Sequence, residues 1–215
     1  RSTKPNWAPQ DPKIHATLSF LTLAPLGYAT YRMSALLQAA KNPRIWTNSD
    51  YINAGLISAI PIGVGLTELK SAGEDGYLRK FFERSTKPNW APQDPKVHAT
   101  LSFLTLAPLG YATYRVIKMS SGLATTPAKA AIGLYGLHAL LTNIYGTEVS
   151  KQNHSNVAMA KAGVAGAAVA FAMAYKNVDR MAFRLSIPHV AYAIFAAIYH
   201  YDLYRLSAGK PMKSL

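Results

Sequence analysis

The chain has 215 residues, of which 50% are apolar and only 15% are charged, against about 25% charged residues in average soluble proteins. The formal net charge is +13, but the basic residues are spread over the segments between apolar runs and form no single stripe, which argues against nucleic-acid binding. The sequence contains no cysteine, which excludes disulfides and thiolate chemistry. Apolar runs of about 15–22 residues alternate with polar stretches, as spans across a hydrocarbon core of about 30 Å require. The composition therefore predicts an all-α membrane protein and not an enzyme.

The first part of the chain is a duplicate of a later part. Residues 1–32 repeat residues 84–115 letter for letter, except that Ile14 stands in place of Val97. A solenoid would show at least three diverged copies, so this is not a solenoid. Because Met33 follows at once and begins what reads like a natural start, we predict that residues 33–215 form a five-helix membrane domain. Residues 1–32 would then be a recent duplication or a product of sequence assembly; if they fold, they add a helix at about 14–31.

Five stretches of residues 33–215 are apolar and long enough to be membrane spans. They are residues 51–69, 97–118, 127–147, 157–175 and 185–204. Trp46, in the polar segment before the first span, is expected to be an anchor at headgroup level. In the fourth span, small residues recur four apart, which lets a neighbouring helix approach closely. The pattern predicts a bundle of five transmembrane helices, plus a sixth if the first copy of the repeat folds.

The segment between the first two spans, residues 70–96, is too long for a simple connector. It contains YLRKFF, expected to form an amphipathic turn on the membrane surface, and KPNWAP at residues 87–92. Pro88 and Pro92 restrict the backbone on both sides of Trp90 and so pin the position of its ring. Trp90 would either fold over the bundle and close a cavity among the helices, or serve as an aromatic anchor at the membrane interface. The sequence favours neither reading.

Polar side chains inside the predicted spans are further candidates, because burying them in a membrane is costly. His138, His189 and His200 are such residues, and His189 and His200 share one helix face. Two histidines from facing helices could ligate a haem iron, but hydrogen bonding between helices is the commoner role. Asn143 would either join two helices or offer a polar group to a ligand. Neither a Ser-His-Asp spacing nor a phosphate-binding loop is present, so no catalytic and no metal-binding residue is predicted.

Several of these motifs, in this order, resemble the translocator protein family, also called tryptophan-rich sensory or peripheral benzodiazepine receptor proteins. The motif KPxWxP matches residues 87–92, and Gly-aromatic-Ala-x-Tyr matches residues 110–114. The family's third-helix pattern is matched loosely by residues 133–135 with Asn143, and its last-helix pattern by IPHVAYA at residues 187–193. The resemblance covers about residues 50–206 and marks the chain as a divergent member.

This resemblance implies a five-helix membrane protein that binds a sterol or a tetrapyrrole such as a porphyrin in a cavity capped by the loop of Trp90. The ligand-binding residues would be Trp90, Pro92, Tyr111, Tyr114, His138, Asn143, His189 and Tyr192. Such a pocket would be ringed by Tyr111, Asn143 and Tyr192. The resemblance also implies a mitochondrial membrane, usually the outer one, and a homodimer as one assembly.

A second reading keeps the fold and drops the ligand. Family members are rich in tryptophan within their helices, whereas this chain has three tryptophans, none inside a predicted span. The chain would then be a non-catalytic accessory subunit of a larger complex, in the inner mitochondrial membrane. That reading predicts filled space beneath the loop and extensive contacts with other chains.

Overall fold

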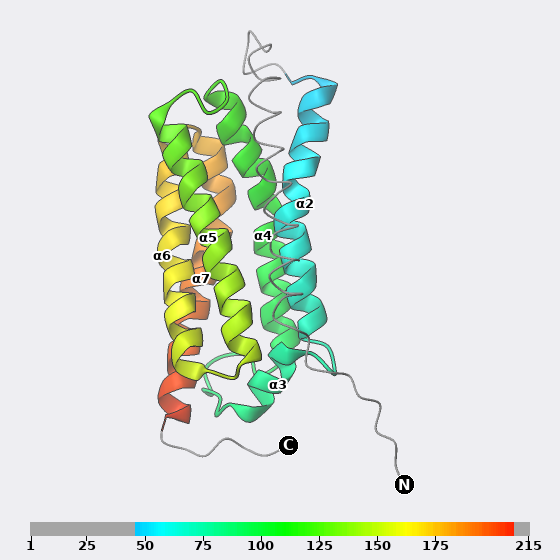
Figure 1. Cartoon of the computed structure of the whole chain (residues 1–215), viewed down its shortest axis with the longest axis vertical. Coiled ribbons are helices and arrows are strands. Elements are labelled where there is room, and N and C mark those ends of the chain that lie inside the picture. Colours follow the sequence, from blue (N-terminus) through cyan, green and yellow to red (C-terminus); the bar gives the residue numbers. More distant parts are fainter. Residues whose placement is uncertain (1–45, 209–215) are drawn as a thin grey trace.

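The computed structural model describes residues 46–208, so the first copy of the repeat and its predicted helix at residues 14–31 lie outside the described residues. The described part is helical: α2 (Asn48–Ser71), α3 (Tyr77–Arg84), α4 (Pro95–Met119), α5 (Thr126–Ser150), α6 (His154–Lys176) and α7 (Arg180–Ser207). The structure assigns no strand within these residues. Each of the five predicted spans lies inside one of the five long helices (Figure 1).

Capping residues explain why the long helices begin upstream of the predicted spans. The side chains of Asp94, Asn153 and Asp179 accept hydrogen bonds of 2.9–3.1 Å from backbone N–H groups two or three positions later. Such bonds satisfy N–H groups that would otherwise lack a partner at a helix start. A proline also stands in the first turn of α4 and of α5, where its missing N–H costs nothing. The apolar runs therefore locate the helices, and the polar residues before them set the first residue.

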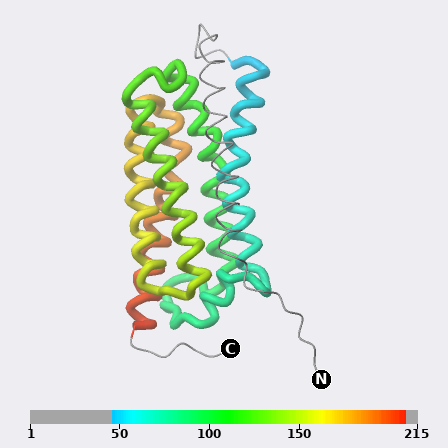
Figure 2. The backbone as a smooth tube through the Cα atoms, in the orientation of Figure 1, coloured from blue at the N-terminus to red at the C-terminus, as the bar shows by residue number. Residues whose placement is uncertain are grey.

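The long helices form a ring in the order α2, α4, α7, α6, α5, because each packs against the next. Figure 2 shows them side by side along the length of the molecule, with α3 at one end. We call that end, which also holds residues 85–94, the loop end. The opposite end holds Trp46 and the turns at residues 120–125 and 177–179. Four of the five sides of the ring are closed by packing, whereas α2 and α5 do not pack closely on each other.

The contact between α2 and α4 is especially close. A Cβ atom on Gly110 of α4 would lie 2.2 Å from Ser58 Cα of α2, which is closer than atoms can approach. A Cβ atom on Gly65 of α2 would lie 2.7 Å from the ring of Phe103 in α4. Because glycine has no side chain, Gly65 and Gly110 let the backbones of α2 and α4 approach as closely as the ring of five helices requires.

At the opposite end, ion pairs hold the helices together. Lys118 Nζ of α4 lies 2.5 Å from Asp50 Oδ2 of α2, and both side chains are buried. Tyr114 donates a short hydrogen bond to the same carboxylate. Trp46 packs on Tyr114 with ring centroids 5.4 Å apart, so this tryptophan is part of the end of the bundle as well as a candidate headgroup anchor.

Within residues 46–208, three helices are long and apolar enough to cross a membrane: α2, α6 and α7. Helices α4 and α5 have 25 residues each but do not meet the same combination of length and composition. Large apolar side chains point outward from the bundle; Ile52, Leu56, Leu104 and Met159 are each at least 60% exposed. Outward apolar faces of this kind are suited to lipid.

Candidate functional site

Helix α3 and residues 85–94 fold across the loop end of the bundle. The apolar face of α3 is buried within the protein, with Leu78, Phe81 and Phe82 at most 1% exposed. Phe82 packs on His98 of α4 and Tyr199 of α7, with ring centroids 5.2 and 5.7 Å apart. The amphipathic segment predicted for the membrane surface is therefore a helix whose apolar side is covered by the protein's own helices, because the ends of α4 and α7 offer it aromatic partners.

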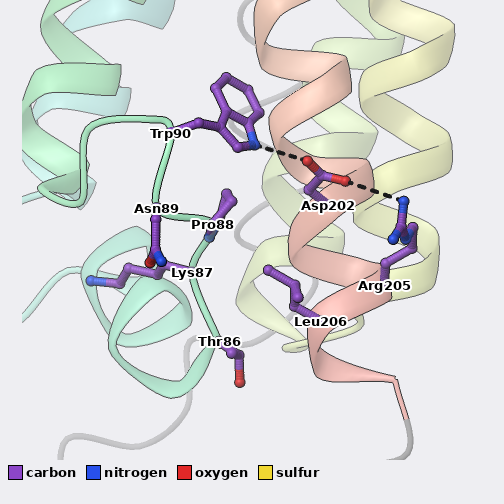
Figure 3. Close-up of a pocket in the computed structure, with 8 residues that line it drawn as sticks. All are labelled: Thr86, Lys87, Pro88, Asn89, Trp90, Asp202, Arg205 and Leu206. Atoms are coloured by element: carbon purple, nitrogen blue, oxygen red, sulfur yellow. Dashed lines mark hydrogen bonds and ion pairs between the residues drawn. The ribbon is translucent and has the colours of Figure 1, made fainter.

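Trp90 ties the loop to the last helix. Its indole Nε1–H donates a hydrogen bond of 2.9 Å to Asp202 Oδ2 on α7 (Figure 3). The indole packs edge-on against Phe195 and Tyr199, with ring centroids 5.8 and 6.1 Å apart. The residue is still 52% exposed. Trp90 thus covers the end of α7 with one part of its surface and faces outward with the other, which agrees with both predicted roles.

Hydrogen bonds within the loop fix its shape. Gln93 Nε2 donates to the carbonyl oxygens of Pro88 and Ala91, at 2.6 and 3.0 Å. Lys87 Nζ donates to the Gln93 carbonyl oxygen at 3.0 Å. His98 Nε2 lies 2.9 Å from the carbonyl oxygen of Pro92 and so attaches the loop to α4. The loop is therefore anchored to α4 as well as to α7.

A surface groove of about 490 Å³ lies between this loop and the end of α7 (Figure 3). It is lined by Thr86, Lys87, Pro88, Asn89, Trp90, Asp202, Arg205 and Leu206. Of the eight predicted ligand-binding residues, only Trp90 belongs to it. This groove is therefore distinct from the predicted pocket.

Beneath the loop, aromatic rings are tightly packed. His98 and Tyr199 have ring centroids 4.4 Å apart, and Phe195 stacks on His98 at 5.8 Å. Two polar atoms in this cluster, His98 Nδ1 and Tyr199 Oη, are buried without a hydrogen-bond partner. A carbonyl oxygen can only accept, so His98 donates from Nε2 to Pro92 and keeps a lone pair on Nδ1. The cluster thus holds an unused acceptor and an unused O–H group side by side.

Three helices meet at a pair of histidines in the middle of the bundle. His138 Nε2 of α5 and His189 Nε2 of α7 are 2.9 Å apart, and His189 Nδ1 is 3.3 Å from Thr105 Oγ1 of α4. Thr105 donates to the carbonyl oxygen of Ser102, so it accepts from His189 Nδ1–H, and His138 Nε2–H donates to His189 Nε2. Two metal–nitrogen bonds of about 2 Å each would not fit between these Nε2 atoms. The histidines join helices here, and in residues 46–208 no three His, Asp or Glu side chains are grouped as metal ligands.

The eight predicted ligand-binding residues do not gather at one place. Trp90 and Pro92 lie at the loop end, and Tyr192 reaches it by donating a 2.8 Å hydrogen bond to the His98 carbonyl oxygen. Tyr111 and Tyr114 pack with Trp46 at the opposite end, about 24 and about 28 Å along α4 from its first residue.

Asn143 is exposed and donates to the Ala139 carbonyl oxygen of its own helix. The structure therefore does not bring Tyr111, Asn143 and Tyr192 around one pocket. The reason is that these residues belong to three different helices, α4, α5 and α7, and lie on different faces and at different heights of the bundle.

Three residues outside the predicted site make contacts at this end of the bundle: Glu68, Lys161 and Asp202. Asp202 and Tyr199 hold Trp90, and Glu68 accepts a 2.6 Å hydrogen bond from Ser102 Oγ on α4. Lys161 could have been found, because it is the one charged residue in the apolar run at 157–175. Asp202 lies in a polar tail of α7, where no pattern marks its partner.

A bundle of long helices with outward apolar side chains, closed at one end by a tryptophan loop, defines a helical membrane protein. The sequence model of the TspO/MBR family matches residues 56–205, which is more than half of the chain. The chain therefore belongs to the TspO/MBR family, as its motifs predicted. A search of curated proteins returned no match.

Proposed function

We propose that this chain is a five-span membrane protein that binds an apolar ligand, a sterol or a tetrapyrrole, inside its ring of helices. In this proposal, residues 85–94 cap the loop end, and the ligand enters between α2 and α5, the one side of the ring that close packing does not seal. The hydrogen bond from Trp90 to Asp202 carries the proposal, because it holds the loop across the end of the ring. The role is binding, with no catalytic step, and the membrane is mitochondrial, the outer one by family resemblance.

The experiment is a titration of the purified protein with protoporphyrin IX and, separately, with a sterol, followed by tryptophan fluorescence. The Trp90→Phe variant is the control, since Trp7 and Trp46 remain in it. We expect saturable quenching at micromolar ligand in the wild-type chain and its loss in the variant. Equal quenching in both proteins would show that the signal does not come from the loop and would refute the cap.

A second function is favoured by the dense aromatic packing beneath the loop. Phe82, His98 and Tyr199 are all buried there, as expected if the space that relatives use for a ligand is filled. The chain would then be an accessory subunit of a larger complex in the inner mitochondrial membrane, with its apolar outer faces covered by other subunits. Absence of binding in the titration, together with co-purification of the chain in a large membrane assembly, would support this function.

A further inference from the structure

Lys161 is a cation inside the ring of helices. It lies on α6 about two turns from its first residue and is 5% exposed. Its Nζ atom lies 3.6 Å from the ring centroid of Tyr145 on α5. Tyr145 Oη in turn lies 3.3 Å from His200 Nε2 on α7. Because this tyrosine bridges to α7, the ammonium group above its ring points into the bundle and does not extend along the helix toward the membrane surface.

The described part of the chain provides no direct ion-pair partner for Lys161. None of the ion pairs among residues 46–208 includes Lys161. Glu68 of α2 attracts Lys161 from across the ring of helices, but the two side chains form no ion pair, and the Glu68 carboxylate accepts a hydrogen bond from Ser102 Oγ. The Tyr145 ring face offsets only part of the cost of burying an ammonium group. Within residues 46–208, therefore, no carboxylate forms an ion pair with the Lys161 ammonium.

The nearby histidines are no partners for the ammonium, because their rings are already engaged in other hydrogen bonds. His200 Nδ1 donates to the Ala196 carbonyl oxygen at 2.8 Å, so its Nε2 accepts the O–H of Tyr145. His98 donates to the Pro92 carbonyl oxygen, and His138 and His189 are hydrogen-bonded to each other, as described above. Next to His200, at a ring-centroid distance of 5.5 Å, lies Tyr199 with its unpartnered O–H group. A cation and an unused hydroxyl thus belong to one continuous cluster of rings.

We propose that Lys161 is an anion-binding residue and that the ligand of this bundle is an amphipathic carboxylic acid. Its carboxylate pairs with the Lys161 ammonium, and its apolar body lies against the aromatic rings at the loop end. The inference rests on the proposed function, since it assumes a ligand inside the ring. A carboxylate is acceptor-only and charged, which matches an unpaired ammonium. A sterol, which carries no charge, would leave Lys161 as it is.

The test measures binding of cis-parinaric acid and of its methyl ester to the full chain in detergent, by the fluorescence of the probe. The variants are Lys161→Met and, as a matched control on the same helix, Lys176→Met, whose side chain is exposed. We expect wild-type protein to bind the acid at least tenfold more tightly than the ester. Lys161→Met should weaken acid binding at least tenfold and leave ester binding unchanged, whereas Lys176→Met should change neither.

Lys161→Arg and a melting curve separate loss of charge from misfolding. The arginine variant should keep a preference for the acid of at least fivefold. Without ligand, Lys161→Met should unfold at a higher temperature than wild type, because it removes an unpaired buried charge. A lower unfolding temperature would show that the ammonium already has a partner and would overturn the inference.

The outcomes distinguish this inference from the function on which it rests. Equal affinity of wild-type protein for acid and ester would overturn the pairing with Lys161 and leave the proposed binding of an apolar ligand standing. Absence of binding by either probe would count against both. Displacement of cis-parinaric acid by dodecyl phosphate at lower concentration than by dodecanoic acid would overturn the choice of a carboxylate in favour of a phosphate headgroup.

Discussion

At the scale of single residues, the loop end depends on the partners that Trp90 finds. The indole N–H meets Asp202 from a position 112 residues away in the sequence. A buried or half-buried indole usually needs such an acceptor. Phe195 and Tyr199 then fix the plane of the ring. The proposed cap is thus a property of α7 as much as of the loop.

The first prediction concerns this acceptor. In a chain with Trp7→Phe and Trp46→Phe, Asp202→Leu should shift Trp90 emission to longer wavelength, because the ring loses its hydrogen bond and enters solvent. Loss of this hydrogen bond to a charged acceptor should make the attachment of the loop to α7 less favourable by about 1.5–3 kcal/mol of free energy. Arg205→Leu is the control, because it removes a charge next to Asp202 without removing the Trp90 acceptor. Arg205 Nη1 lies 3.9 Å from Asp202 Oδ1, and the Arg205 side chain is 64% exposed. Unchanged emission in Asp202→Leu would contradict the cap.

At the scale of helices, the interface of α2 and α4 depends on small residues at defined heights. Gly110 and Ser58 meet backbone to backbone, whereas Gly136 of α5 faces open space. A glycine-to-alanine substitution should therefore destabilise the protein at position 110 but not at position 136.

The second prediction uses this contrast. Gly110→Ala should force α2 and α4 apart and lower the free energy of unfolding by about 1–3 kcal/mol. Gly136→Ala should be neutral or raise it by up to about 1 kcal/mol, because alanine favours a helix over glycine. Chemical denaturation in detergent, monitored by circular dichroism, measures both. Equal effects would show that the two helices are not in close contact.

The third prediction concerns the turn between α6 and α7. Asp179 accepts a 2.6 Å hydrogen bond from Arg115 Nε of α4 and one of 3.0 Å from the Met181 N–H. Burial raises the pKa of Asp179, but these hydrogen bonds outweigh it and hold the pKa below its usual value of 3.8. The carboxylate therefore stabilises the folded state above about pH 4, and this contribution disappears as the pH falls through the lowered pKa.

The Asp179→Asn variant isolates that contribution. Near pH 7 it should be less stable than wild type by about 1.5–3 kcal/mol, the value of a hydrogen bond to a charged group. The difference should shrink steadily as the pH is lowered from 4, because the wild-type carboxyl then becomes neutral as well. Unfolding temperatures measured between pH 3 and pH 7 would show this, and a difference that stays constant with pH would contradict it.

At the scale of the whole molecule, the number of spans sets the side of the membrane on which each connecting loop lies. Helices α2, α6 and α7 are apolar enough to cross a membrane, while α4 and α5 are as long but more polar. A five-span chain places the α4–α5 turn on the side opposite to the loop end. If α4 and α5 do not cross the membrane, the α4–α5 turn and the loop end lie on the same side.

The fourth prediction decides between these topologies by labelling introduced cysteines. Because the chain has no native cysteine, every label reports on the introduced residue. Single cysteines are placed at Asp75, Ala124 and Asn177, which are all exposed. In sealed vesicles, a membrane-impermeant maleimide should label Ala124→Cys from the same side as Asn177→Cys, and Asp75→Cys from the other side. Labelling of Ala124→Cys together with Asp75→Cys would refute five spans.

Apolar run length, capping residues and short motifs are local properties of the chain, so the helical membrane class, the positions of the long helices and the family could all be predicted from the sequence. It also marked Trp90 and the intramembrane histidines as candidates. The structure was needed to show that His138 pairs with His189, that Trp90 pairs with Asp202 and that Tyr111 packs on Trp46 at the opposite end of the bundle from Trp90. These pairings depend on which helix faces meet and at what height, and side chains from distant segments come together only when the bundle packs.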